Sequence, residues 1–341
     1  MEGKEYYKVI GDNEKQKETA YQDLQEVLDT KSPSLAKHEL EKTAKEIEII
    51  NLTQGIADEM IRGYGGDPKS VPLDHVYVLD DVNKVTEGRL EKGVHHPLEL
   101  TVGIERSASS LIFASTIAHE LFHSKSFKSV RVDRKDRIRL YRSGLSMVDR
   151  KDETKEHGRE KEYFGDMEEA IVAECTRIFM DKLENKEQFK DEIEAINRLK
   201  EWIAQSYRRG DVPEEKISIL ENEIKYIPMA QEKVKDIMTS YENENERSAM
   251  AAGMFSKLLE QGDVERVERY VEREKLYKLL DRIIENSEGK FKNRDGIFGE
   301  FAKANFTGNY LPLARTVEGI LGKGSFRKLA EEFSRKSSEK K

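Results

Sequence analysis

Two histidines and a glutamate stand close together in the segment His119-Glu120-Leu121-Phe122-His123. On a helix, positions 119 and 123 are about 400° of rotation and about 6 Å of rise apart, so both imidazoles project from the same face. Neutral imidazole is a ligand that zinc prefers, and a catalytic zinc ion takes three protein ligands and keeps one position for water. The spacing therefore predicts that His119 and His123 bind one Zn²⁺ ion.

Glu120 lies about 100° round the same helix from His119, near the ion but angled towards a bound water. A carboxylate in that position can accept the proton of the water. Zinc lowers the pKa of its water and polarises an amide carbonyl, so the attack needs no nucleophilic side chain. We therefore predict that Glu120 is the general base.

The third ligand must come from another part of the chain. The position six residues after His123 is Ser129, so an extended histidine motif is absent. A later helix opens with the acids Glu168 and Glu169, and a carboxylate from such a helix completes other catalytic zinc sites. We predict Glu169 as the ligand with Glu168 on its solvent side, and we keep Glu168 as the alternative. An acid near a helix N-terminus is also favoured by the helix dipole without any metal.

The helices and strands that position these residues follow from hydrophobic spacing and from Gly and Pro breaks. Ser107, Ser109 and Ser110 offer an N-cap to the motif helix. His95 and His96, before Pro97, are interpreted as loop residues rather than ligands. The predicted helices are 14–28, 35–64, 107–123 and 167–183, with further helix after 184 and a packed apolar unit over 298–333. The predicted strands are 76–81, 98–104 and 141–149. We also predict a polar loop over 150–162 and disorder over 334–341.

Composition limits the partners of the chain. Acidic residues outnumber basic ones by 67 to 59, so a nucleic-acid phosphate backbone is not an expected partner. No segment approaches the roughly 20 apolar residues that cross a bilayer and no export signal opens the chain, so we expect no membrane partner and a cytoplasmic, soluble protein. Cys175 is the only cysteine, which excludes an intrachain disulfide and a thiolate-rich zinc site.

The HELFH segment followed by Glu169-Ala170-Ile171 resembles the gluzincin zinc metallopeptidases, and most of all the compact minigluzincins, over about residues 70–183. The resemblance implies that His119, His123 and Glu169 bind zinc and that Glu120 is the base. It also implies a zincin-like sheet whose edge strand pairs with the substrate backbone. The substrate would then be a peptide or an unfolded protein.

The chain departs from the family at the residue that usually holds a histidine ligand. That position, one turn after the zinc glutamate, is Ala173, and the nearest acid is Glu174. The family also stabilises the developing oxyanion with a His, Tyr or Arg. Tyr163 is our first candidate for this catalytic role, with His157 and Arg142 as alternatives.

Together these features predict an α+β fold that is mostly helical, with a small mixed β-sheet packed on the motif helix. We expect an N-terminal helical region (1–64), a zincin-like catalytic domain (65–183) and a C-terminal helical domain (184–341). The predicted activity is zinc-dependent hydrolysis of peptide bonds. The alternative is a catalytically inactive or autoinhibited zincin-like helical interaction protein, which the charge-rich flanking helices and Ala173 favour. A nucleic-acid-linked regulator is disfavoured by the charge.

Overall fold

The computed structural model describes residues 6–86, 92–133, 135–150, 160–208, 230–241, 243–260 and 270–336. The chain divides into two compact units. Unit 1 comprises Met1–Glu105, Thr116–Cys175 and Glu272–Lys341, and unit 2 comprises Arg106–Ser115 and Thr176–Val271. The fold is α+β and mostly helical with small mixed sheets, which confirms the predicted class.

A three-stranded mixed sheet in unit 1 has the order β2-β4-β3. Its strands are β2 (Val76–Leu79), β4 (Thr101–Glu105) and β3 (Gly93–His96). β2 runs parallel to β4, whereas β3 is antiparallel to β4 and forms an edge of this sheet. The predicted strands near 76–81 and 98–104 are confirmed, but β3 was not predicted.

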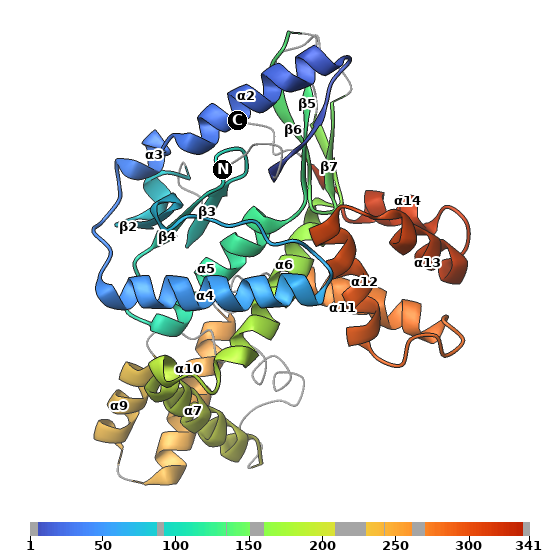
Figure 1. The fold of residues 1–341 in the computed structure, drawn as a ribbon. Helices are drawn as coiled ribbons and strands as arrows, with labels where there is room; N and C mark the ends of the chain where they lie inside the picture. The colour runs from blue at the N-terminus through green and yellow to red at the C-terminus, as the bar shows by residue number, and fades with distance from the viewer. Residues whose placement is uncertain are drawn as a thin grey trace. The chain divides into compact units, whose positions relative to one another are not determined.

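A six-stranded sheet, also in unit 1, has the order β1-β5-β6-β7-β8-β9. Its strands are β1 (Lys8–Ile10), β5 (Lys128–Val132), β6 (Ile138–Ser143), β7 (Ser146–Arg150), β8 (Glu160–Tyr163) and β9 (Arg335–Lys336). Helix α2 (Glu14–Asp29) packs on β1 and β5 of this sheet (Figure 1). Leu24 and Leu28 of α2 belong with Val9 and Val130 to one buried hydrophobic cluster.

The second predicted helix begins later than expected. Residues 33–36 form the short helix α3 (Pro33–Ala36), and α4 (Ala44–Gly63) starts only after Thr43. Thr43 and Glu46 form a reciprocal capping box, which stabilises a helix start at this point. Between the two helices the amide of Leu40 donates to the carbonyl of Val78 in β2, over 2.7 Å. The prediction of one continuous helix over 35–64 is therefore wrong over residues 37–43.

The remaining helices of unit 1 include the motif helix and a C-terminal group. They are α5 (Ser110–Lys125), α6 (Gly165–Leu183), α11 (Tyr270–Glu285), α12 (Arg294–Thr307), α13 (Leu311–Leu321) and α14 (Ser325–Glu332), with the 3-10 turns η1 (Leu73–His75) and η2 (Val82–Lys84). The unit boundaries fall inside α5, α6 and α11. Within the described ranges, every helix is too short or too polar to cross a bilayer.

Unit 2 is helical, with η3 (Glu187–Phe189), α7 (Lys190–Arg208), α9 (Ala230–Ser240) and α10 (Glu244–Glu260). Polar contacts join α7 to α10. Nε1 of Trp202 donates to Oε2 of Glu244 over 2.6 Å, and the hydroxyls of Ser206 and Ser248 lie 3.0 Å apart. Because the Trp202 indole is buried, this hydrogen bond satisfies a donor that water cannot reach.

The divisions expected at 65 and 184 do not coincide with these two units. The N-terminal helix α2 covers the sheet that contains β5, and the C-terminal strand β9 pairs with β8, so both ends of the chain belong to unit 1. Arg335 and Lys336 were predicted to be disordered, and they form β9 instead because Lys336 pairs with Lys161 and Arg335 with Glu162. Of the predicted loop over 150–162, residues 151–159 lie outside the described residues, and the prediction is wrong at both ends because residue 150 belongs to β7 and 160–162 belong to β8.

Candidate metal centre

The motif helix α5 has a polar cap at its N-terminus. Oγ of Ser109 accepts from the amide of Ile112 over 3.1 Å, which confirms the predicted serine cap. The carboxylate of Glu192, at the start of α7, accepts from the amides of Ser110 and Leu111 over 2.8 and 3.2 Å. A carboxylate at this end also interacts favourably with the helix dipole. These bonds satisfy amides that have no partner inside the helix.

The other end of α5 is held by a buried lysine. Nζ of Lys128 donates to the carbonyls of His123, over 3.0 Å, and of Ser124, where the last turn has unsatisfied acceptors. Asn305 of α12 continues this anchoring, because its Nδ2 donates to Oγ of Ser126 and its Oδ1 accepts from the amide of Leu145, both over 2.9 Å. The turn that carries His123 is thereby fixed in position.

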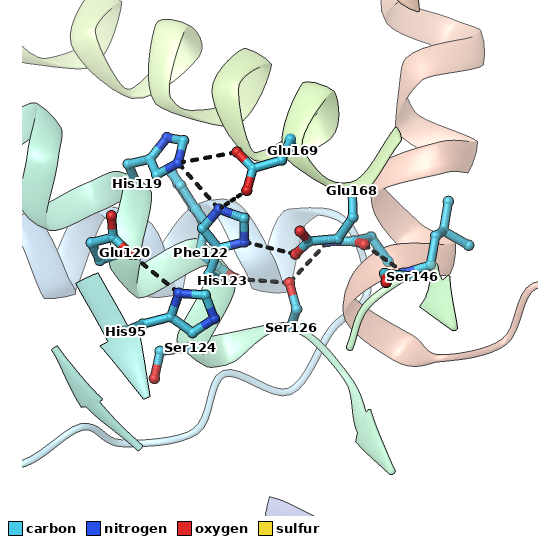
Figure 2. A network of polar contacts seen from close by, with 12 residues as sticks. His95, His119, Glu120, Phe122, His123, Ser124, Ser126, Ser146, Glu168 and Glu169 are labelled. Carbon is cyan, nitrogen blue, oxygen red and sulfur yellow. Dashed lines mark hydrogen bonds and ion pairs between the residues drawn. The ribbon is translucent and has the colours of Figure 1, made fainter. Parts of the chain in front are cut away.

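His119, His123 and Glu169 converge on one point (Figure 2). Nε2 of His119 and Nε2 of His123 lie 3.1 Å apart. Oε1 of Glu169 lies 3.4 Å from the His123 Nε2, and Oε2 of Glu169 lies 3.8 Å from the His119 Nε2. All three possible ligand atoms lie within 4.8 Å of one another. The predicted set is therefore brought together from α5 and α6.

The separations fit a tetrahedral zinc ion. With Zn–N and Zn–O bonds of about 2.0 to 2.1 Å, donor atoms on a tetrahedron lie about 3.3 Å apart, close to the distances found here. Two histidines and one glutamate also form a known zinc donor set that keeps a position open for water. The residues present therefore fit Zn²⁺, with His119, His123 and Glu169 as the ligands.

Glu168 is buried beside the cluster, and our prediction that it faces solvent is wrong. Its Oε1 lies 2.8 Å from Nδ1 of His123. Since an ionised carboxylate only accepts hydrogen bonds, Nδ1 carries the proton, and a neutral ring then presents its Nε2 lone pair to the metal position. The carboxylate next to the His123 ring is therefore that of Glu168, in the turn before Ala173. Glu174 accepts a hydrogen bond from Tyr277 instead.

Glu120 is buried, and it lies on the side of the two histidines that faces away from Glu168 (Figure 2). Its Oε2 lies 3.2 Å from Nδ1 of His95. Burial favours the neutral acid, but the hydrogen bond from His95 and the charge of the neighbouring imidazoles outweigh it and hold the pKa of Glu120 below its usual value. The group is therefore ionised near neutral pH and able to accept a proton.

Comparisons with protein-family models, with curated proteins and with solved structures each return no match. The geometry of the site is thus the basis for interpreting it.

His95 is a site residue that the sequence did not reveal. It belongs to β3, so the interpretation of His95 and His96 as loop residues is wrong. The His95 ring stacks on the ring of His123, with centroids 4.8 Å apart and planes at 6°. Burial lowers the pKa of His95. The Gly93-Val94 pair and the following Pro97 were the available signs of a short strand, but nothing local places this strand beside α5.

Neither of the two described candidates for oxyanion stabilisation joins the cluster. Tyr163 lies in β8 under the ammonium of Lys161, and within the described part of the chain it forms no hydrogen bond or ring contact with the cluster, so its role stays a prediction. Arg142 donates to the carbonyls of Gly144 and Gly308, each over 2.7 Å, and so has a packing role. His157 lies outside the described residues.

The acidic residues of the site attract positive charge. Burial of the His123 ring disfavours its cation, but the carboxylates of Glu168 and Glu169 outweigh this effect and raise the pKa of His123 well above its usual value. Two buried acids next to the His123 ring therefore stabilise a cation at this place, which is a proton when no metal competes for it.

Proposed function

We propose that this protein is a zinc-dependent metallopeptidase of the gluzincin type, most like the minigluzincins. The observation that carries the proposal is the convergence of His119, His123 and Glu169 within 4.8 Å, with the ionised Glu120 beside them. A bound zinc ion supplies a Lewis acid that lowers the pKa of water and polarises a carbonyl group. The ligands come from two helices, so their arrangement is rigid before substrate arrives.

In the proposed reaction Glu120 moves a proton twice. It first accepts a proton from the attacking water while the water oxygen forms a bond to the scissile carbonyl carbon. It then returns this proton to the amide nitrogen while the carbon–nitrogen bond breaks, which leaves a carboxyl group and an amine. Glu168 keeps His123 in the tautomer that binds the metal, so it acts before the chemistry rather than during it.

The sheet supports a peptide as the substrate class. β3 is at the edge of its sheet, and His95 and Gly93 of this strand both lie next to Glu120. An extended peptide can pair with an exposed strand edge through main-chain hydrogen bonds, which brings its backbone amides past the site. We therefore propose extended peptides or unfolded protein segments as substrates.

Zinc analysis combined with a peptide-library cleavage profile tests the proposal. We expect the wild type to bind one zinc ion per chain and to cleave peptides, and Glu120→Gln to keep the zinc while its kcat falls about 10²- to 10⁴-fold, because the base is lost but no ligand is. Glu105→Gln, in β4 outside the cluster, serves as the matched control and should cleave like the wild type. Purified protein without stoichiometric zinc, or unchanged cleavage by Glu120→Gln, would contradict the proposal.

The same experiment separates the alternative function. Full zinc occupancy with no cleavage of any library peptide would support a catalytically inactive or autoinhibited zincin-like interaction protein instead.

A further inference from the structure

β3 presents two of its residues to one carboxylate. Successive side chains of a strand point to opposite faces, so positions 93 and 95 share a face. A Cβ at Gly93 would lie only 2.8 Å from Cγ and from Oε1 of Glu120, and His95 bonds to Oε2 of the same group. The strand therefore approaches Glu120 closely at one residue and holds it with the other.

The hydrogen bond from His95 has a defined direction. A general base acts as a carboxylate, which only accepts hydrogen bonds, so in the proposed function Nδ1 of His95 is the donor to Oε2 of Glu120. The plane of the His95 ring is set independently by its parallel stacking on His123. Two separate contacts thus fix the ring, and the ring in turn fixes one carboxylate oxygen (Figure 2).

A role as an additional metal ligand does not fit this geometry. Parallel rings 4.8 Å apart direct their nitrogens along separate planes, so the two imidazoles do not aim at a common point. Among the described residues, the possible ligand group around His123 contains only His119 and Glu169 besides it. His95 therefore lies beside the metal position and contacts the base.

We propose that His95 is a positioning residue that holds Oε2 of Glu120 and so fixes the orientation of the carboxylate that accepts the proton of the attacking water. This inference rests on the proposed peptidase function. It extends that function by assigning a task to a strand residue outside the zinc motif. Since a misplacement of about 1 Å in a reacting group can cost about 10²-fold in rate, a carboxylate free to rotate should be a poor base even with the metal in place.

The test compares His95→Ala with His95→Asn, each measured for zinc content, kcat and KM on a peptide that the wild type cleaves. The amide nitrogen of Asn can occupy the place of Nδ1 and donate the same hydrogen bond, whereas Ala cannot. We expect full zinc content in both variants, a kcat about 10- to 100-fold lower for Ala with KM changed less than about twofold, and recovery of most of this loss with Asn. His96→Ala is the matched control, because its ring bonds to Glu99 and should leave kcat unchanged.

The possible failures are distinguishable. An active wild type whose kcat survives His95→Ala would overturn the positioning role alone, and so would an equal loss of kcat in the Ala and Asn variants. Loss of zinc from His95→Ala would also overturn it, because the residue would then act through His123. A wild type without zinc or turnover would overturn the proposed function and this inference together.

Discussion

Nδ1 of His123 donates a hydrogen bond to Oε1 of Glu168 over 2.8 Å, while the other nitrogen of the same ring lies 3.4 Å from Glu169. Two consecutive residues of α6 thus contact opposite nitrogens of one imidazole. Neighbouring residues on a helix point about 100° apart, so one acid can reach the metal position while the other reaches behind the ring. A single turn of helix therefore sets both the orientation of His123 and the place of Glu169, the proposed third ligand.

Removal of the Glu168 carboxylate should weaken zinc binding without removing a ligand. We expect zinc affinity to fall about 10- to 100-fold in Glu168→Ala and less in Glu168→Gln, whose amide oxygen still accepts from Nδ1. Competition with a chromogenic chelator measures the affinities. Glu174→Gln is a control on the same helix, because Glu174 contacts Tyr277 rather than the cluster. Unchanged affinity in Glu168→Ala would show that His123 needs no such partner.

Zinc affinity should depend on pH in a defined direction. The pKa of His123 in the metal-free protein is raised, so the ring holds a proton up to a higher pH than an ordinary histidine. Zinc must displace this proton, so its affinity should fall as the pH drops below that pKa, by up to about tenfold per pH unit. In Glu168→Gln the ring loses a neighbouring negative charge, and the fall should begin at a lower pH. Zinc titrations over a pH series measure both curves, and coincident curves would contradict this explanation.

A methyl group at position 93 should disturb the base. In Gly93→Ala the new Cβ would meet Glu120 at 2.8 Å and Cγ2 of Thr116 at 2.9 Å, so the strand or the carboxylate must move. We expect kcat to fall about 10²-fold with zinc still bound. In Gly55→Ala nothing lies within 4 Å of the new Cβ, which makes this α4 variant the control. It should keep full activity and gain about 0.5 to 1 kcal/mol of stability. Equal activities of the two variants would show that β3 can withdraw from Glu120.

The acidic cap of the motif helix should contribute measurably to stability. Glu192 accepts from the amides of Ser110 and Leu111 and from the hydroxyl of Ser109. We expect Glu192→Ala to lower the free energy of unfolding by about 1 to 2 kcal/mol, as loss of an N-cap does. Chemical denaturation gives this value, and Glu194→Ala, an exposed acid of the same helix, should change it by less than about 0.5 kcal/mol. Similar losses in both variants would assign the effect to general charge instead.

The sequence alone determined the features that depend on local geometry. Because an α-helix has 3.6 residues per turn, the spacing of His119 and His123 places both rings on one face wherever the helix lies. The helical and β-branched patterns likewise predicted α2, α5, α6, β2 and β4, together with the mostly helical α+β class. The nearby acids of α6 were also identified locally, although not their division of tasks.

Only the tertiary structure decided which distant groups meet this helix. The packing of α6 on α5 placed Glu169 next to Nε2 of His123 and turned Glu168 towards Nδ1 of the same ring. The pairing of β3 with β4 brought His95 to Glu120, which lies 25 residues further along the chain. Such contacts depend on how whole helices and strands pack against one another. The free energy of that packing comes from apolar surface buried by many residues, so no short sequence pattern predicts it. For the same reason β9 could not be anticipated, because its two residues become a strand only through pairing with β8.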